Sequence, residues 1–265
     1  MTMATPETNK KQGIQTSGKY IFDNDNLIFD PFLLNNTKYT DNWDPDVNLL
    51  RNSTDNSCQY FSENSFSTLC NTLPKNTFSI LHLNIRSLPR NHDHFVHYLS
   101  TLRHEFSIIG LTETWLQDST SHLYDIPNYT SIHCCRSTRM GGGVSILLHE
   151  SMQFIERKDL AIQAENGQIE SMFIEIPASS LTTAKSLIIG CIYRPPNSDI
   201  KTFISDLTLT LDAIDKEGKN CYLIGDFNLD LLKSENHSLT ADFLNTLYSC
   251  SYFPTITKPS RITKT

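Results

Sequence analysis

The chain has 265 residues, 38% of them hydrophobic, with a mean hydropathy of −0.31 and a formal net charge of −7. This apolar content is enough for the core of one domain of up to about 200 residues plus a polar tail. The acidic balance argues against tight DNA binding without metal, but it does not exclude a site that gathers divalent cations.

The cysteines and the apolar runs set further limits. None of the seven cysteines belongs to a CxxC pair, which argues against a zinc site and favours free, buried thiols in a reducing compartment. No apolar run approaches the ~20 residues of a membrane-spanning helix, and the polar start of the chain lacks the apolar segment of a signal peptide. We therefore expect no membrane partner and a nuclear or cytoplasmic location.

Residues 1–75 differ in composition from the rest of the chain. They are rich in Asn, Ser, Thr and Asp, with only scattered apolar groups. Because such a segment buries little apolar area per residue, we predict a largely disordered N-terminal arm, with a short helix between Cys58 and Leu69. Residues 76–265 are predicted to form the folded domain.

Apolar runs and helical periodicity alternate along residues 76–265. The predicted strands are 78–84, 106–111, 144–148, 169–176, 186–193 and 221–224, and the predicted helices are 91–104, 199–216 and 239–247. Gly141-Gly142-Gly143 is interpreted as a turn, because it lacks the Lys-Ser/Thr of a P-loop and precedes a strand. This rhythm favours two packed β-sheets with helices outside, and by itself also permits a doubly wound sheet.

Four polar motifs follow apolar runs at predicted strand ends. They are Leu83-Asn84-Ile85-Arg86, Leu111-Thr112-Glu113-Thr114-Trp115, Ile192-Tyr193-Arg194-Pro195-Pro196-Asn197 and Gly225-Asp226-Phe227-Asn228. In the last motif, strand alternation predicts that Asp226 and Asn228 lie on one side of the pleat. A carboxylate is a hard ligand suited to Mg²⁺, and an amide can orient a phosphate or a water. Taken alone, this tetrapeptide also fits an ordinary strand that ends in an Asp/Asn turn.

The ordered set of four motifs resembles the endonuclease/exonuclease/phosphatase family, the fold of apurinic-site nucleases and deoxyribonuclease I. The sequence motifs LTETWL, YRPPN and GDFN are similar to those of the endonuclease domain of non-LTR (LINE-type) retrotransposon polymerase polyproteins. The resemblance covers residues 78 to 265. It implies a four-layer α/β sandwich that nicks DNA with Mg²⁺, or Mn²⁺ in its place, for target-primed reverse transcription. It also implies a reverse transcriptase domain downstream in the parent polyprotein.

The resemblance also implies roles for individual residues. Glu113 is expected to bind the metal, and Asn84 lies near both metal and phosphate. Asp226 orients or deprotonates the attacking water, and Asn228 beside it holds the phosphate. The hydroxyl of Tyr193 contacts the phosphate. From the residues alone, a solvated surface charge is the slightly favoured interpretation of Glu113, and Tyr193 also fits a core aromatic at a strand end.

Two further residues of the YRPPN motif are candidate phosphate or DNA contacts. Arg194 offers a guanidinium and Asn197 an amide, both suited to phosphate oxygens. The residues alone are as compatible with ordinary solvent-facing positions in the loop.

The sequence departs from the family's pattern in two places. Arg86 stands where many relatives have an acidic metal ligand. The family also ends on a strand that carries Asp-His, and the only such pair here, Asp93-His94, comes too early, while His237 lies in a predicted loop. We therefore expect a C-terminally truncated domain without its last strand, with an open sheet edge and an activity reduced by about 10²–10⁴-fold.

Two other functions stay open from the sequence. The missing Asp-His pair is compatible with a non-enzymatic remnant or a nucleic-acid-binding fragment. The same fold also serves phosphatases and abasic-site nucleases, which a panel of substrates would distinguish from a DNA-nicking enzyme.

Overall fold

The computed structural model describes residues 12–16, 58–74, 77–136, 141–162, 169–181, 185–256 and 258–260. One sheet contains β1 (Gln12–Thr16), β6 (Ile155–Glu156), β7 (Glu170–Ile176), β8 (Leu187–Tyr193), β9 (Asn220–Asp226) and β10 (Tyr252–Pro254). A second sheet contains β2 (Ile80–Asn84), β3 (Ile108–Thr112), β4 (Tyr129–Cys134) and β5 (Val144–His149). The strand orders are β10-β1-β9-β8-β7-β6 and β2-β3-β5-β4, and both sheets mix parallel and antiparallel pairs.

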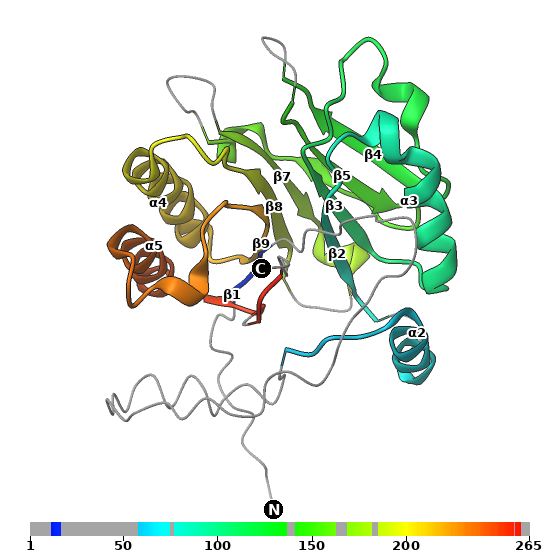
Figure 1. Ribbon diagram of the computed structural model, residues 1–265, viewed down its shortest axis with the longest axis horizontal. Helices are drawn as coiled ribbons and strands as arrows, with labels where there is room; N and C mark the ends of the chain where they lie inside the picture. The colour runs from blue at the N-terminus through cyan, green and yellow to red at the C-terminus, as the bar shows by residue number, and fades with distance from the viewer. Residues whose placement is uncertain are drawn as a thin grey trace, which may run out of the picture.

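Helices cover the outer faces of the two sheets. They are α3 (Leu88–Leu102), α4 (Ile200–Glu217) and α5 (Ser238–Ser249), and a further helix, α2 (Glu63–Thr72), packs beside α3. Short 3₁₀ helices are η1 (Ser121–Tyr124), η2 (Lys158–Leu160), η3 (Ala178–Ser180) and η4 (Leu231–Lys233). Figure 1 shows α4 and α5 on the six-stranded sheet and α3 on the opposite side of the molecule. The predicted α/β fold with two packed sheets and outer helices is confirmed, and the doubly wound alternative is not found.

Apolar side chains fill the three spaces between these layers. One cluster lies between α4, α5 and the six-stranded sheet and includes Phe203 and Leu223. A second lies between the sheets and includes Ile146 and Ile189. A third, which includes Phe95, lies between α3 and the four-stranded sheet. Burial of three apolar layers stabilises the sandwich mainly through the hydrophobic effect.

Two described segments lie within the predicted N-terminal arm. The strand β1 pairs in parallel with β9 on one side and with β10 on the other. The helix α2 packs Phe66 on the ring of Phe106, with 5.9 Å between ring centroids. The helix expected between Cys58 and Leu69 is therefore present as α2, which begins and ends a few residues later in the sequence. Residues 1–11 and 17–57, where disorder is predicted, lie outside the described residues.

The membrane prediction rests on helix length and polarity. Within the described ranges, no helix is both long and apolar enough to cross a bilayer.

Candidate active site

Four strands bring the predicted site residues to one edge of the sandwich. The parallel strands β2 and β3 end together, with Asn84 opposite Thr112. The parallel strands β8 and β9 also end together, with Tyr193 opposite Asp226. Because the two sheets pack face to face, the carboxyl ends of these strands meet, and Glu113 follows directly on Thr112.

Asn84 links the two sheets at this edge. Its side chain is only 4% exposed. The Nδ2 atom donates to Oε1 of Glu113 at 2.7 Å and to Oδ2 of Asp226 at 2.6 Å. The Oδ1 atom is buried and has no hydrogen-bond partner among the described residues. The sequence-predicted metal ligand and general base therefore converge on one amide.

The loop that carries Glu113 is held in an unusual backbone conformation. Glu113 and Trp115 have φ values of +53° and +55°. Trp115 N donates to Gly142 O at 2.8 Å, and Thr114 N donates to Gly143 O at 3.3 Å. Non-glycine residues at positive φ cost free energy and persist where surrounding contacts enforce them, often at functional sites. The glycines predicted to form a turn thus hold the Glu113 loop.

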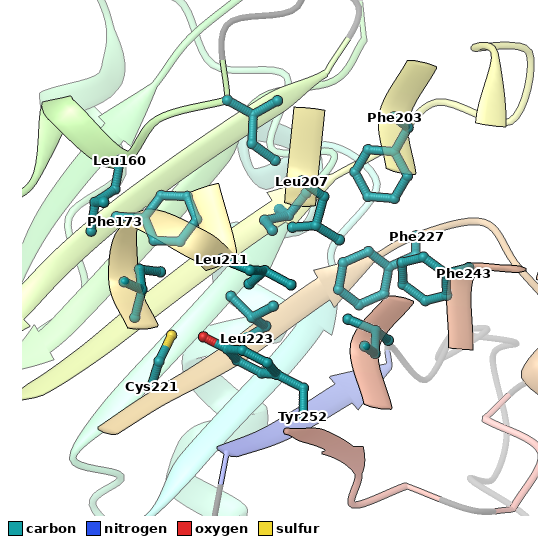
Figure 2. Close-up of a cluster of buried hydrophobic side chains, with 14 of the residues drawn as sticks. Leu160, Phe173, Phe203, Leu207, Leu211, Cys221, Leu223, Phe227, Phe243 and Tyr252 are labelled. Atoms are coloured by element: carbon teal, nitrogen blue, oxygen red, sulfur yellow. The ribbon is translucent and has the colours of Figure 1, made fainter. Parts of the chain in front are cut away.

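The turn after β9 is fixed by its glycine and its aromatic residue. Gly225 has φ +151°, and a Cβ atom there would lie 1.9 Å from Ile192 O, so a side chain does not fit. Phe227 is 2% exposed and packs on the rings of Phe203 and Phe243, with centroids 6.2 and 5.5 Å away. Figure 2 shows these three rings grouped within the core. Phe227 therefore anchors the turn while its neighbours face the site.

A turn after β9 places Asn228 next to Asp226, and the alternation of side chains along a strand does not. The strand β9 ends at Asp226, and Asn228 has φ +47°. Asn228 N donates to Oδ1 of Asp226 at 3.1 Å, and Asn228 Nδ2 donates to Arg194 O at 2.8 Å. The expectation of a shared strand face is therefore wrong, although the two residues do lie together.

The side chain of Arg194 is buried in the protein and does not face solvent as a phosphate contact was expected to do. The side chain is 1% exposed. Its guanidinium donates to the carbonyls of Phe227 at 2.6 Å and Asn228 at 2.9 Å. It also donates to the carbonyl of Ser198 at 2.9 Å. Burial lowers its pKa. Arg194 thus connects the loop after β8 with the turn after β9, and its donors point into protein.

Tyr193 and Asn197 come from the same motif but differ in burial. Tyr193 is 6% exposed, and burial together with the charges of Glu113 and Asp226 raises the pKa of its hydroxyl. The hydroxyl therefore stays protonated at neutral pH and is available as a hydrogen-bond donor. Asn197 is exposed in the turn that precedes α4, where it remains accessible to a large ligand.

The histidines singled out in the sequence have other positions. Asp93 and His94 are exposed on α3. His237 caps α5, where its Nδ1 accepts from Thr240 N at 3.2 Å. Sequence reasoning did not single out Glu170, which is 6% exposed and accepts from Gly143 N at 2.9 Å. The available signal was a charged residue at the first position of a strand whose other residues are mostly apolar.

The donor atoms at this edge fit a hard divalent cation. Glu113 and Asp226 supply carboxylate oxygens, and Asn84 supplies the unpartnered, buried Oδ1. Buried polar atoms without a partner commonly mark the place of a water or an ion. Across the described part of the chain, no three His, Cys, Asp or Glu side chains gather as a cluster able to hold a metal. A small donor set suits Mg²⁺, which keeps several waters and is completed by substrate phosphate.

Comparisons with known proteins agree with this architecture. The sequence pattern of the endonuclease/exonuclease/phosphatase family matches residues 81–263. No curated protein sequence matches the chain.

Three solved structures illustrate the likeness. The endonuclease domain of TRAS1, a telomere-specific non-LTR retrotransposon, is 12% identical, with 66% of this chain and 71% of that chain covered and a TM-score of 0.47. D. rerio TDP2 humanized by 14 mutations is 16% identical, with coverages of 63% and 66% and a TM-score of 0.46. The Xenopus laevis APE2 catalytic domain is 18% identical, with coverages of 63% and 67% and a TM-score of 0.45. On the strength of the family match, the chain belongs to the endonuclease/exonuclease/phosphatase family.

Proposed function

We propose that this chain is a divalent-metal-dependent endonuclease domain of a non-LTR retrotransposon. It nicks one strand of duplex DNA and leaves a 3′-hydroxyl that primes reverse transcription by a domain encoded downstream. Family membership supports phosphoester chemistry. The LTETWL, YRPPN and GDFN motifs, which lie at the strand ends that form the site, support the retrotransposon assignment.

The observation that carries the proposal is the Asn84 amide between two carboxylates. Glu113 and Asp226 come from different sheets, yet both accept from the same nitrogen at 2.7 and 2.6 Å. Two negative charges this close repel each other, and the repulsion grows where solvent is excluded. A divalent cation held by these residues would offset that repulsion and would neutralise charge on a phosphate. Mg²⁺ is the proposed ion, with Mn²⁺ as a substitute.

The remaining residues have defined tasks in the proposed hydrolysis. Asp226, fixed through both oxygens by Asn84 and by Asn228 N, accepts a proton from the attacking water. Water oxygen bonds to phosphorus as the P–O3′ bond breaks, and the 3′-oxygen takes a proton from solvent. The protonated hydroxyl of Tyr193 donates to a phosphate oxygen as negative charge accumulates there. Asn228 and the exposed Asn197 are placed to contact the flanking phosphodiester chain.

The test is nicking of supercoiled plasmid in Mg²⁺, followed by gel electrophoresis. We expect the unaltered chain to produce nicked circles, and Asp226→Ala to reduce the rate by about 10²–10⁴-fold, because the proton acceptor is lost. Glu113→Ala should abolish Mg²⁺-dependent nicking, because a proposed metal ligand is lost. Glu235→Ala, which removes an exposed carboxylate, is the control and should leave the rate unchanged.

Three results would contradict the proposal. Equal nicking by the Asp226→Ala variant would remove the assigned role of that carboxylate. Folded protein that binds DNA but never nicks it would favour the nucleic-acid-binding fragment. Release of inorganic phosphate from small phosphomonoesters, without nicking, would favour a phosphatase of the same fold.

A further inference from the structure

We propose that Glu170 is a positioning residue for the metal ligand Glu113, acting across the two sheets through the glycine loop Gly141–Gly143. The inference deepens the proposed function and rests on it. Glu170 opens β7 of the six-stranded sheet, whereas the glycine loop leads into β5 of the four-stranded sheet. A carboxylate from one sheet thus accepts a hydrogen bond from the loop that leads into the other sheet.

The contacts of Glu170 account for its burial. Its Oε2 accepts from Gly143 N at 2.9 Å, and its Oε1 pairs with the guanidinium of Arg136. The side chains of Glu170 and Arg136 are 6% and 11% exposed. A charge this buried is retained only where opposite charge and hydrogen bonds offset its desolvation. Removing the carboxylate therefore leaves a buried guanidinium without its counter-charge.

The glycine loop is closely packed against Arg136, Glu170 and Thr114, so a shift of one of these groups would displace the loop. Its three glycines have φ values of +95°, +74° and +87°. A Cβ atom on Gly142 would lie 2.5 Å from Arg136 and 2.7 Å from Oε1 of Glu170. A Cβ atom on Gly143 would lie 2.5 Å from Oγ1 of Thr114, which is fully buried. Gly142 and Gly143 therefore permit close approaches that a side chain would block.

The loop passes this constraint directly to Glu113. Gly142 O and Gly143 O accept from the two residues that follow Glu113, Trp115 N at 2.8 Å and Thr114 N at 3.3 Å. Glu113 itself is held at φ +53°, a conformation that relaxes when the supporting contacts go. Loss of the Glu170 grip therefore moves the Glu113 carboxylate away from Asn84 and weakens ion binding.

The expected effect is on ion affinity, since the oxygens of Glu170 already have protein partners. Glu170→Gln keeps an acceptor for Gly143 N but removes the charge that holds Arg136. Residues that orient a metal ligand typically contribute 10–100-fold in metal affinity. We expect a rise of about tenfold or more in the Mg²⁺ concentration for half-maximal nicking, with the rate at saturating Mg²⁺ little changed. Glu170→Asp, which keeps the charge, should restore part of the affinity.

Tb³⁺ luminescence provides a measurement that does not depend on activity. The chain has two tryptophans, Trp43 and Trp115, so a Trp43→Phe background leaves Trp115, two residues from Glu113, as the sensitiser. In this background Glu170→Gln should raise the Tb³⁺ concentration for half-saturation about tenfold. Glu175→Gln is the matched control: it lies on the same strand and is 9% exposed, but it pairs with Arg157. Its Tb³⁺ affinity should stay unchanged.

A second variant guards against misfolding of the first. Gly143→Ala leaves Glu170 intact and displaces Thr114, so it should weaken Tb³⁺ binding in the same direction. An unchanged Tb³⁺ affinity in folded Glu170→Gln or Gly143→Ala overturns the positioning role, whether or not the chain nicks DNA. Tb³⁺ binding that depends on Glu113 and Glu170 in a chain that never nicks overturns the proposed nuclease alone. No Glu113-dependent Tb³⁺ signal overturns both.

Discussion

The Arg194→Met variant tests whether Arg194 stabilises the fold or contacts phosphate. The guanidinium donates to Phe227 O at 2.6 Å and to Ser198 O at 2.9 Å, and both of these residues are buried. Hydrogen bonds from a charged donor contribute about 1.5–3 kcal/mol each, so losing two lowers the free energy of unfolding by about 3–6 kcal/mol. Asn228 is exposed, so water can replace the guanidinium at its carbonyl and this third bond adds little.

The assay is urea unfolding followed by circular dichroism. Arg194→Lys should be destabilised nearly as much as Arg194→Met, because one ammonium cannot span carbonyls in two directions as a planar guanidinium does. Arg90→Met removes an exposed arginine of α3 and should change the free energy of unfolding by less than about 0.5 kcal/mol. If Arg194→Met unfolds at the same urea concentration as the unaltered chain but binds DNA more weakly, the side chain contacts phosphate and our reasoning is wrong.

Two other predictions concern the core. Phe227→Ala should lower the free energy of unfolding by about 3–5 kcal/mol, since it empties a site between two aromatic rings; a loss below about 1 kcal/mol in urea unfolding would mean that Phe227 does not anchor the turn. Burial lowers the pKa of His82 to about 3, while the unfolded imidazole titrates near 6.5. Unfolding therefore takes up a proton between these values, and stability should fall with falling pH by up to about 1.4 kcal/mol per pH unit. His82→Leu should remove this part of the slope, and an unchanged slope would refute the assignment.

The long, strongly periodic elements could be predicted from the sequence because one face of each is apolar. The predicted helix 199–216 matches α4, which begins after Asp199, whose carboxylate accepts from Thr202 N at 2.7 Å. The helix predicted from residue 91 begins at Leu88 instead. Pro89 is tolerated in the first turn, and the hydroxyl of Ser87 accepts from Arg90 N at 3.4 Å, so the helix extends back toward the site.

Short and polar strands escaped prediction for a different reason. The strand β4 contains Thr130, Ser131 and His133 and is only partly buried, so it lacks a clear alternation of apolar and polar residues. The strand β6 has two residues, and its pairing depends on β7. Such strands form because a neighbouring strand offers backbone partners, and that information is not local to their own sequence.

The sequence predicted that the candidate residues would lie near one another, but it did not predict their contacts. Strand-end motifs indicated Asn84, Glu113 and Asp226, because polar side chains at the ends of buried strands meet where those strands end. The local pattern could not reveal that Arg194 points into the protein, since two of its acceptors, Phe227 O and Asn228 O, lie more than thirty residues away in the turn after β9. Burial of an arginine is decided by tertiary partners, and periodicity does not report them.

The spacing between the sheets decides whether these motifs can act together. The hydrogen bond from Asn84 to Asp226 crosses from one sheet to the other at 2.6 Å. The two sheets approach closely at Gly110, where a Cβ atom would lie 2.3 Å from Cδ1 of Ile224. A side chain at position 110 would therefore displace the neighbouring residues, because a close-packed core has little free volume to absorb the added atoms. Gly110 therefore contributes to the geometry of the candidate site by permitting this close approach of the sheets, although it carries no chemistry of its own.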